Sequence, residues 1–313
     1  MRLRQAALAT TLALGMTGCA AMPAASQAAT YKTGVGDNNP AMFASPAYKA
    51  LKTRITRFIA PYNLVTTPAD LATFRQWLAG ANADHVQPLI AFYHSRVHGT
   101  KLPSIATYTT DIKKFMKDFP SIKNYTPWNE ENRGNVTISG GASYDSPSAK
   151  LSAEYYVALK KVCKGCTIVG ADVLDGSNPK PTITYIRQFQ ADVKKLHSSL
   201  PTIWGLHNYS DTNRFRDAGT KDVLAAVKGQ VWLTETGGLV NFGGAFPYSL
   251  TRANKAVAYM FKLAKSNKRI TRLYIYNWFG EPSTARFDAG LVDQTGTVPR
   301  PAYFTVLKQL TGL

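Results

Sequence analysis

The stretch IKNYTPWNEENRG, residues 122–134, begins like a β-strand and ends in a run of polar side chains. Its first half is rich in the aromatic and β-branched residues that favour strands, and Asn129 and Glu130 follow Trp128 directly. A strand that delivers an amide and a carboxylate at its end is typical of parallel α/β folds, which place functional side chains at the carboxyl ends of their strands. The rest of the chain decides which α/β fold this is.

Segments on both sides of this stretch repeat its pattern. Short apolar runs alternate with amphipathic segments of helical period, such as DLATFRQWLAGAN and ANKAVAYMFKLAKSN. The runs predict eight strands, at residues 31–36, 54–61, 86–94, 122–130, 166–174, 202–209, 230–236 and 272–280. Residues 30–313 provide about 35 positions for each strand–helix unit, close to the size of a (β/α)₈ barrel. No linker, low-complexity segment or repeat divides them, so we predict a single (β/α)₈ TIM barrel over 30–313.

The first 29 residues have the order of a bacterial secretory leader. Arg2 and Arg4 precede a short apolar run, and small residues follow it. Two processing routes stay open: MTGC resembles a lipobox, which would make Cys19 the lipidated residue, and ASQAA around Ala28 resembles an ordinary signal-peptidase site. Residues 1–29 therefore predict a protein that is secreted, or lipid-anchored outside the cytoplasmic membrane.

Two further cysteines, Cys163 and Cys166, form a C-x-x-C pattern. No second pair is present to complete a zinc site, and the surroundings are not those of a thioredoxin-like motif. In an oxidising compartment this pattern favours a structural disulfide that closes the turn between a helix and a strand.

The chain is strongly basic, with 37 Lys and Arg against 19 Asp and Glu, and a formal net charge of +18. There is no run of basic residues and no nucleic-acid motif, so the charge favours attraction to the cell envelope or to an anionic polysaccharide. If the substrate carries uronic acids, Arg96, Arg133 and Arg214 are the candidates to contact them. We predict a monomer that binds no nucleic acid.

Polar or aromatic candidates stand at or near the end of every predicted strand. In chain order they are Asp37, Arg57, His94, Asn129 with Glu130, Asp172 with Asp175, His207 with Tyr209, Glu235, and Trp278 with Glu281. A closed barrel brings such positions to one mouth. Glu130 and Glu235 lie about three strand–helix units apart, on the fourth and seventh strands. A carboxyl pair across a cleft is what glycoside hydrolysis requires, and Tyr209 could donate a hydrogen bond that keeps one carboxylate ionised.

WNEEN at the end of the fourth strand and WLTETGG at the end of the seventh resemble the signatures of clan A, the "four-seven" superfamily of retaining glycoside hydrolases. The resemblance implies that Glu130 is the general acid/base and Glu235 the nucleophile. By the same resemblance Asn129 holds the sugar 2-hydroxyl and Arg57 orients the nucleophile. His207 and Tyr209 resemble the strand-six pair beside it, and Trp278 resembles the aromatic platform under the sugar. Within the clan, the short barrel and GADVLD look most like family 39 and the Asl1-like branch, although Glu131 and Asn132 replace the common proline pattern.

Other polar residues near these motifs have less specific interpretations. Strand alternation points Glu131 away from Glu130, which favours a structural role, and Asp172 and Asp175 favour the same. Glu281 either contacts substrate or belongs only to its loop. His94 is a candidate substrate contact, because its i, i+4 spacing to His98 comes with no third metal ligand. The sequence predicts no metal and no cofactor.

Together these patterns predict a secreted retaining glycoside hydrolase that cleaves β-glycosidic bonds in a polysaccharide or oligosaccharide by double displacement. Two alternatives stay open. An envelope transglycosylase would use the same residues with a sugar acceptor in place of water, and a carbohydrate-binding barrel would have lost turnover.

Overall fold

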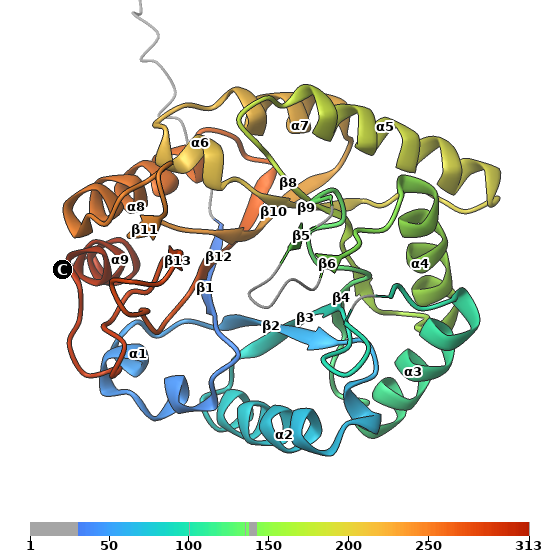
Figure 1. The fold of residues 1–313 in the computed structure, drawn as a ribbon, viewed down its shortest axis with the longest axis horizontal. Coiled ribbons are helices and arrows are strands. Elements are labelled where there is room, and N and C mark those ends of the chain that lie inside the picture. The colour runs from blue at the N-terminus through green and yellow to red at the C-terminus, as the bar shows by residue number, and fades with distance from the viewer. Residues whose placement is uncertain (1–30, 100, 135, 138–142, 313) are drawn as a thin grey trace, which may run out of the picture.

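The computed structural model describes residues 31–99, 101–134, 136–137 and 143–312 (Figure 1). The predicted leader at residues 1–29, with Cys19, lies outside these residues. No helix in the described part of the chain has the length and apolar character needed to cross a membrane.

A closed ring of parallel strands forms the centre of the molecule (Figure 1). The strands are β1 (Lys32–Gly36), β2 (Ile55–Pro61), β3 (Gln87–Tyr93), β4 (Asn124–Thr126), β7 (Thr167–Ile168), β8 (Gly170–Leu174), β9 (Ile203–His207), β10 (Gln230–Thr236) and β12 (Ile270–Tyr276). Only Val169 separates β7, which pairs with β4, from β8, which pairs with β9. These two segments are therefore halves of one strand, and the predicted (β/α)₈ barrel is confirmed.

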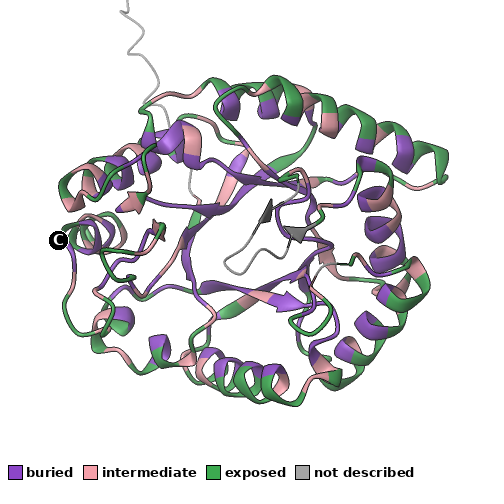
Figure 2. Ribbon diagram, viewed as in Figure 1, coloured by how far each residue is buried: buried purple, intermediate pink, exposed green. Residues whose placement is uncertain are grey.

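Helices surround the ring and turn their buried faces inward (Figure 2). They are α1 (Pro46–Ala50), α2 (Pro68–Ala83), α3 (Ile105–Asp118), α4 (Ala149–Val162), α5 (Lys180–Lys195), α6 (Tyr209–Asn213), α7 (Ala218–Ala226), α8 (Leu250–Lys265) and α9 (Pro301–Thr311), with 3₁₀ turns η1 (Pro40–Ala44) and η2 (Leu64–Thr66). Ser104, Ser148 and Ser249 each accept a hydrogen bond from the backbone N–H three residues later, which fixes where α3, α4 and α8 begin.

The fourth strand is shorter than its sequence suggests. We predicted a strand over residues 122–130, but β4 ends at Thr126 because Pro127 has no N–H to donate to a ladder. The chain stays fixed beyond that point: Trp128 is fully buried and stacks on Tyr155 with ring centroids 5.4 Å apart. This packing holds the backbone that carries Asn129 and Glu130.

The predicted disulfide between Cys163 and Cys166 is present and lies between the end of α4 and the start of β7. The connections beyond the strand ends add two small antiparallel pairs. One joins β5 (Val136–Thr137) to β6 (Ser143–Tyr144) after β4. The other joins β11 (Asn241–Phe242) to β13 (Phe287–Asp288), which ties the connections after β10 and β12 together.

Candidate active site

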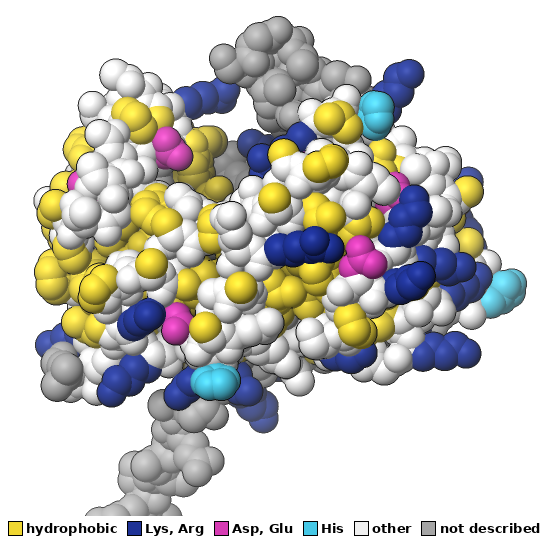
Figure 3. Space-filling view, turned by 90° about the horizontal axis from the view of Figure 1, so that it is seen from below, with side chains coloured by type: hydrophobic (Ala, Val, Ile, Leu, Met, Phe, Trp, Pro, Cys, Tyr) yellow, Lys and Arg dark blue, Asp and Glu magenta, His cyan; other side chains and the backbone are white. Residues whose placement is uncertain are grey.

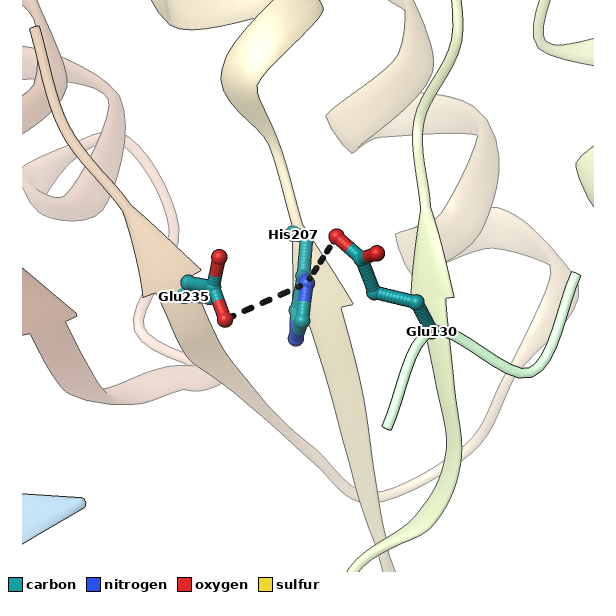
Figure 4. A group of neighbouring side chains, drawn as sticks. All are labelled: Glu130, His207 and Glu235. Atoms are coloured by element: carbon teal, nitrogen blue, oxygen red, sulfur yellow. Dashed lines mark hydrogen bonds and ion pairs between the residues drawn. The ribbon is translucent and has the colours of Figure 1, made fainter. Parts of the chain in front are cut away.

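Glu130 and Glu235 lie together at the carboxyl ends of the barrel strands, with His207 between them (Figure 4). Glu130 Oε1 is 3.3 Å from His207 Nδ1, and Glu235 Oε2 is 3.8 Å from the same nitrogen. One oxygen of each glutamate lies within 4.8 Å of the other. That separation suits the spacing of about 5–5.5 Å used for double displacement, and not the roughly 6.5–9.5 Å that leaves room for an attacking water.

The backbone at Glu130 adopts a conformation that is uncommon for a residue with a side chain. Its φ of 50° lies in the left-handed region, which costs roughly 1–2 kcal/mol. Hydrogen bonds hold the residues on both sides: the Asn129 N–H donates to Phe92 O at 2.8 Å, and the Glu131 N–H donates to Asp172 O at 3.0 Å. Such strain is concentrated at functional sites, and here it turns the Glu130 carboxylate toward His207.

Arg57, on β2, organises the Glu235 side of the site. Its Nη1 donates to Glu235 Oε2 at 2.7 Å, and its Nη2 donates to Asn129 Oδ1 at 2.6 Å and Asp172 Oδ2 at 3.0 Å. The other oxygen of Glu235 accepts from Tyr209 Oη at 3.0 Å. Both oxygens of Glu235 are thus fixed by donors, and the carboxylate keeps one orientation.

Asp172 and His207 form a buried ion pair beneath the two glutamates. Burial raises the pKa of Asp172, but His207 and Arg57 outweigh it and lower the pKa to about 2. Burial lowers the pKa of His207, but Asp172 and Glu235 outweigh it and raise the pKa to about 10. The ring nitrogens of His207 lie 3.3 Å from Asp172 Oδ2 and from Glu130 Oε1, and Arg57 Nη2 also lies 3.3 Å from Nε2. Gly205 makes room for this pair, because a Cβ there would collide with the Asp172 side chain.

Glu130 has a second cationic neighbour in Arg133, whose Nη1 donates to Glu130 Oε2 at 2.5 Å. Burial raises the pKa of Glu130, but the hydrogen bond from His207 and the charge of Arg133 outweigh that effect and lower the pKa below its usual value. The contacts with Arg133 and His207 therefore favour the ionised form of Glu130.

Glu130, His207 and Glu235 are also close enough to one another to share a metal ion. These donors already have other partners, because the two ring nitrogens of His207 face Glu130, Asp172 and Arg57. Each glutamate is already paired with an arginine. We therefore assign no metal ligands among these residues.

Of the predicted site residues, the structure brings together Arg57, Asn129, Glu130, His207, Tyr209 and Glu235. His94 is buried beside these residues, with its ring centroid 5.0 Å from that of Trp128, and burial lowers its pKa to about 4. Glu281 is exposed in the connection that follows β12. The structure does not test the substrate contacts predicted for His94 and Glu281, which stay predictions.

The predicted platform role of Trp278 is wrong. Its ring is fully buried and packs edge-on against Tyr48 and Tyr303, with centroids 5.6 and 6.0 Å away, so no face is open to a sugar. The reason is the end of the strand: β12 stops at Tyr276, and Asp37 Oδ2 then accepts from the N–H groups of Trp278 and Phe279. These bonds direct the Trp278 side chain into the core.

Two tyrosines at strand ends were missed by the sequence analysis. Tyr276, the last residue of β12, is partly exposed, and burial followed by the charge of Glu235 raises its pKa. Tyr93 ends β3, and burial followed by the charge of Glu130 raises its pKa to about 12. The signal that could have found them is their place at the last position of a strand.

Two predicted structural roles agree with the contacts. Asp175 accepts from the N–H groups of Ser210 and Asp211 at 2.9 and 2.6 Å and so caps α6. Asp172 positions Arg57 and His207 through their charged groups.

The fold matches those of known glycoside hydrolases, whereas comparisons of the sequence find nothing. No protein-family model matches the chain, and no curated protein does. Similar solved structures include GH5_18 from Streptomyces cattleya in complex with GlcNAc, at 13% identity and a TM-score of 0.62, covering 90% of this chain and 80% of that one. Xylanase 10B from Thermotoga maritima matches at 12% identity and 0.60, covering 91% and 97%. A psychrophilic family 10 endo-β-1,4-xylanase matches at 15% and 0.62, covering 88% and 96%. At these identities the likeness shows a shared (β/α)₈ fold.

Proposed function

We propose that this chain is a retaining glycoside hydrolase of the clan A type, which cleaves β-glycosidic bonds by double displacement. One observation carries the proposal: two buried glutamates, one after the fourth barrel strand and one on the seventh, hold oxygens within 4.8 Å of each other. That separation is the geometry of a nucleophile and an acid/base that act on one anomeric carbon. The resemblance of WNEEN and WLTETGG to the clan A signatures supports the same assignment.

In the first step, a carboxylate oxygen of Glu235 attacks the anomeric carbon while Glu130 donates its proton to the departing glycosidic oxygen. The bond to the leaving group breaks, and a glycosyl ester with Glu235 forms. In the second step, Glu130 takes a proton from water, the water oxygen attacks the same carbon, and the ester bond breaks to return Glu235 as a carboxylate. Two inversions give net retention.

The side chains that contact the glutamates have functions in these two reaction steps. Arg57 and Tyr209 hold Glu235 in line for attack, which lowers the entropy cost of reaching the transition state. Asn129 gives its side-chain oxygen to Arg57, which leaves its amide group for the sugar 2-hydroxyl. The positive charge of Arg57, 2.7 Å from Glu235 Oε2, stabilises Glu235 when it leaves as a carboxylate.

The compartment and the substrate belong to the same proposal. The leader-like N-terminus and the disulfide support export from a bacterial cell. We propose a polysaccharide or oligosaccharide substrate, acted on by a monomer at the cell envelope. The first neutral glycans to test as substrates are xylan, for which the xylanases are named, and Manβ1-4GlcNAc, which is bound to the Streptomyces cattleya enzyme. The kinship to family 39 and the Asl1-like branch remains a prediction.

The direct test compares variants on a panel of glycans. Glu235→Gln should lower kcat/KM on any cleaved glycan by about 10⁴-fold or more, and Glu130→Gln by about 10²–10⁴-fold. Asp222→Asn, an exposed change on α7 that removes one negative charge, is the matched control and should retain activity. Proton NMR of the first product should show the β-anomer.

An α-anomer as the first product, or an active Glu235→Gln variant, would reject this function. Product analysis at high sugar concentration separates hydrolysis from transfer, since a transglycosylase releases longer glycans. Binding of glycans without cleavage would favour the carbohydrate-binding alternative.

A further inference from the structure

Arg133 differs from the other charged groups around the glutamates in its exposure. Its side chain is 41% exposed, whereas Arg57, His207 and Asp172 are 1%, 0% and 0% exposed. It also lies in the connection after β4 and not on a strand. The Arg133 side chain therefore contacts the proposed acid, interacts with Tyr93, and is still partly exposed to solvent.

The contacts of Glu130 favour its ionised form. Arg133 Nη1 donates to Glu130 Oε2 at 2.5 Å, and His207 Nδ1 lies 3.3 Å from Glu130 Oε1. A proton added to Glu130 in this state would leave an excess positive charge beside Arg133, which is unfavourable in a buried site. Glu130 must nevertheless carry a proton to act as the acid in the first step.

We propose that Arg133 binds a carboxylate of the substrate, that of a uronic acid next to the scissile bond on the leaving-group side, and that this binding frees Glu130 to take up its catalytic proton. The inference rests on the proposed function, in which Glu130 is the acid. Arginine and carboxylate form a two-pronged pair that is stronger and more specific than a contact to a hydroxyl. With the substrate anion compensating Arg133, a protonated Glu130 restores the charge balance.

A neutral glycan has no negative charge to place beside Arg133. When it separates Arg133 from Glu130, the positive charge of Arg133 stays without a partner. The enzyme would therefore be selective for acidic glycans at the step of proton donation, and not only at binding. The surface of the molecule agrees with an acidic polymer: Lys and Arg outnumber Asp and Glu by 37 to 19, and they are spread over the face shown in Figure 3.

The described titratable groups that face Glu130 lie on several other strands. His207 on β9 has a pKa raised to about 10 by Asp172 and Glu235 against the effect of burial, and Tyr93 on β3 has a pKa raised to about 12 by burial. Tyr209 and Tyr276 also have pKa values raised, by burial first and then by neighbouring carboxylates. Glu235 on β10 is paired with Arg57. A change at Arg133 is thus expected to appear in the pH profile through Glu130.

The test uses matched substrates and two variants. A uronic-acid oligosaccharide and the same oligosaccharide with its carboxyl group reduced to an alcohol are given to the wild type, to Arg133→Gln, and to Arg187→Gln, an exposed control on α5 with the same change of charge. The wild type and the control should prefer the acidic substrate by tenfold or more in kcat/KM, about the value of one charged hydrogen bond. Arg133→Gln should lose that preference to within about twofold.

The pH profile separates this proposal from a purely structural role. On the neutral substrate the basic limb of the kcat/KM profile of Arg133→Gln should move to higher pH, because Glu130 has lost a cationic neighbour. An equal loss of activity on both substrates, or a retained preference, would overturn the proposal. A higher rate on a sulfated analogue than on the uronic acid would overturn the assignment of the anion to a carboxylate.

Binding of glucuronate by calorimetry distinguishes this proposal from the proposed function. Weaker binding to Arg133→Gln than to Arg187→Gln would support the anion site even if no glycan in the panel is cleaved. Equal binding to both, together with cleavage of a neutral glycan, would overturn the anion site and leave the glycosidase intact.

Discussion

Arg57 joins three strands of the barrel through one guanidinium group. It contacts Glu235 on β10, Asp172 on β8 and Asn129 after β4, and only 2% of the residue is exposed. A buried cation of this kind is costly to desolvate, and its removal leaves two carboxylates without their partner. The residue therefore couples the stability of the barrel to the orientation of the proposed nucleophile.

Arg57→Lys separates charge from geometry. Lysine retains the positive charge but cannot reach Glu235, Asn129 and Asp172 with fixed prongs, so we expect kcat/KM to fall by about 10²–10³-fold. The variant should remain folded, with a lower melting temperature, by calorimetry and circular dichroism. An Arg57→Lys enzyme with activity close to that of the wild type would show that orientation by Arg57 is not required.

The sequence could predict the two glutamates because their strands are recognisable and their order fixes which strand ends meet. It could not predict the pairing of Arg133 with Glu130, since that contact depends on the path of a connection. Trp278 was misplaced for a related reason: a strand that ends two residues before it puts Tyr276 at the mouth and sends Trp278 into the core.

At the scale of elements, the connection from β4 to α4 carries an acid and a buried carboxyl side by side. Glu131 is fully buried, and neither of its oxygens has a well-formed hydrogen bond within the described part of the chain. Burial, followed by the charge of Asp172, raises its pKa to about 8 from an ordinary 4.5, although nearby Ser152 acts in the opposite direction. The structural role predicted for Glu131 therefore requires its neutral form.

Glu131→Gln should change how stability depends on pH. Because the folded state binds the proton more tightly than the unfolded state, the wild type is stabilised fully below pH 4.5 and loses that contribution as pH rises through about 8. Glutamine has no proton to lose, so the variant should gain melting temperature relative to the wild type as pH rises from about 5 to about 8. A difference between the two proteins that does not change with pH would contradict a neutral buried Glu131.

The exact ends of the strands could not be predicted from the sequence. Eight strands were placed correctly in order, but β4 is only three residues long, and the fifth strand is divided at Val169. Ala171 has a φ of 48° there, a local irregularity that no propensity indicates. Proline at position 127 was the one visible sign that the fourth strand ends early.

At the scale of the whole molecule, closure of the barrel brings together residues that are remote in sequence. Glu130 follows β4 and Glu235 lies on β10, with β8 and β9 between these two strands. The glutamates meet because β7 and β8 complete the ring. The repeated strand–helix pattern of the sequence predicts this closed ring. The distance between the glutamates also depends on Arg57, His207 and the strained backbone at Glu130, which only the structure shows.

In the proposed mechanism Glu235 is the group that becomes bonded to the sugar. The direct measurement is to treat the protein with an activated 2-fluoroglycoside of a cleaved sugar, digest it, and locate the modified residue by mass spectrometry. We predict one label per chain, on Glu235 within the peptide that contains WLTETGG, with Glu130 unmodified. A label on any other residue, or hydrolysis of the reagent without a trapped ester, would contradict the account.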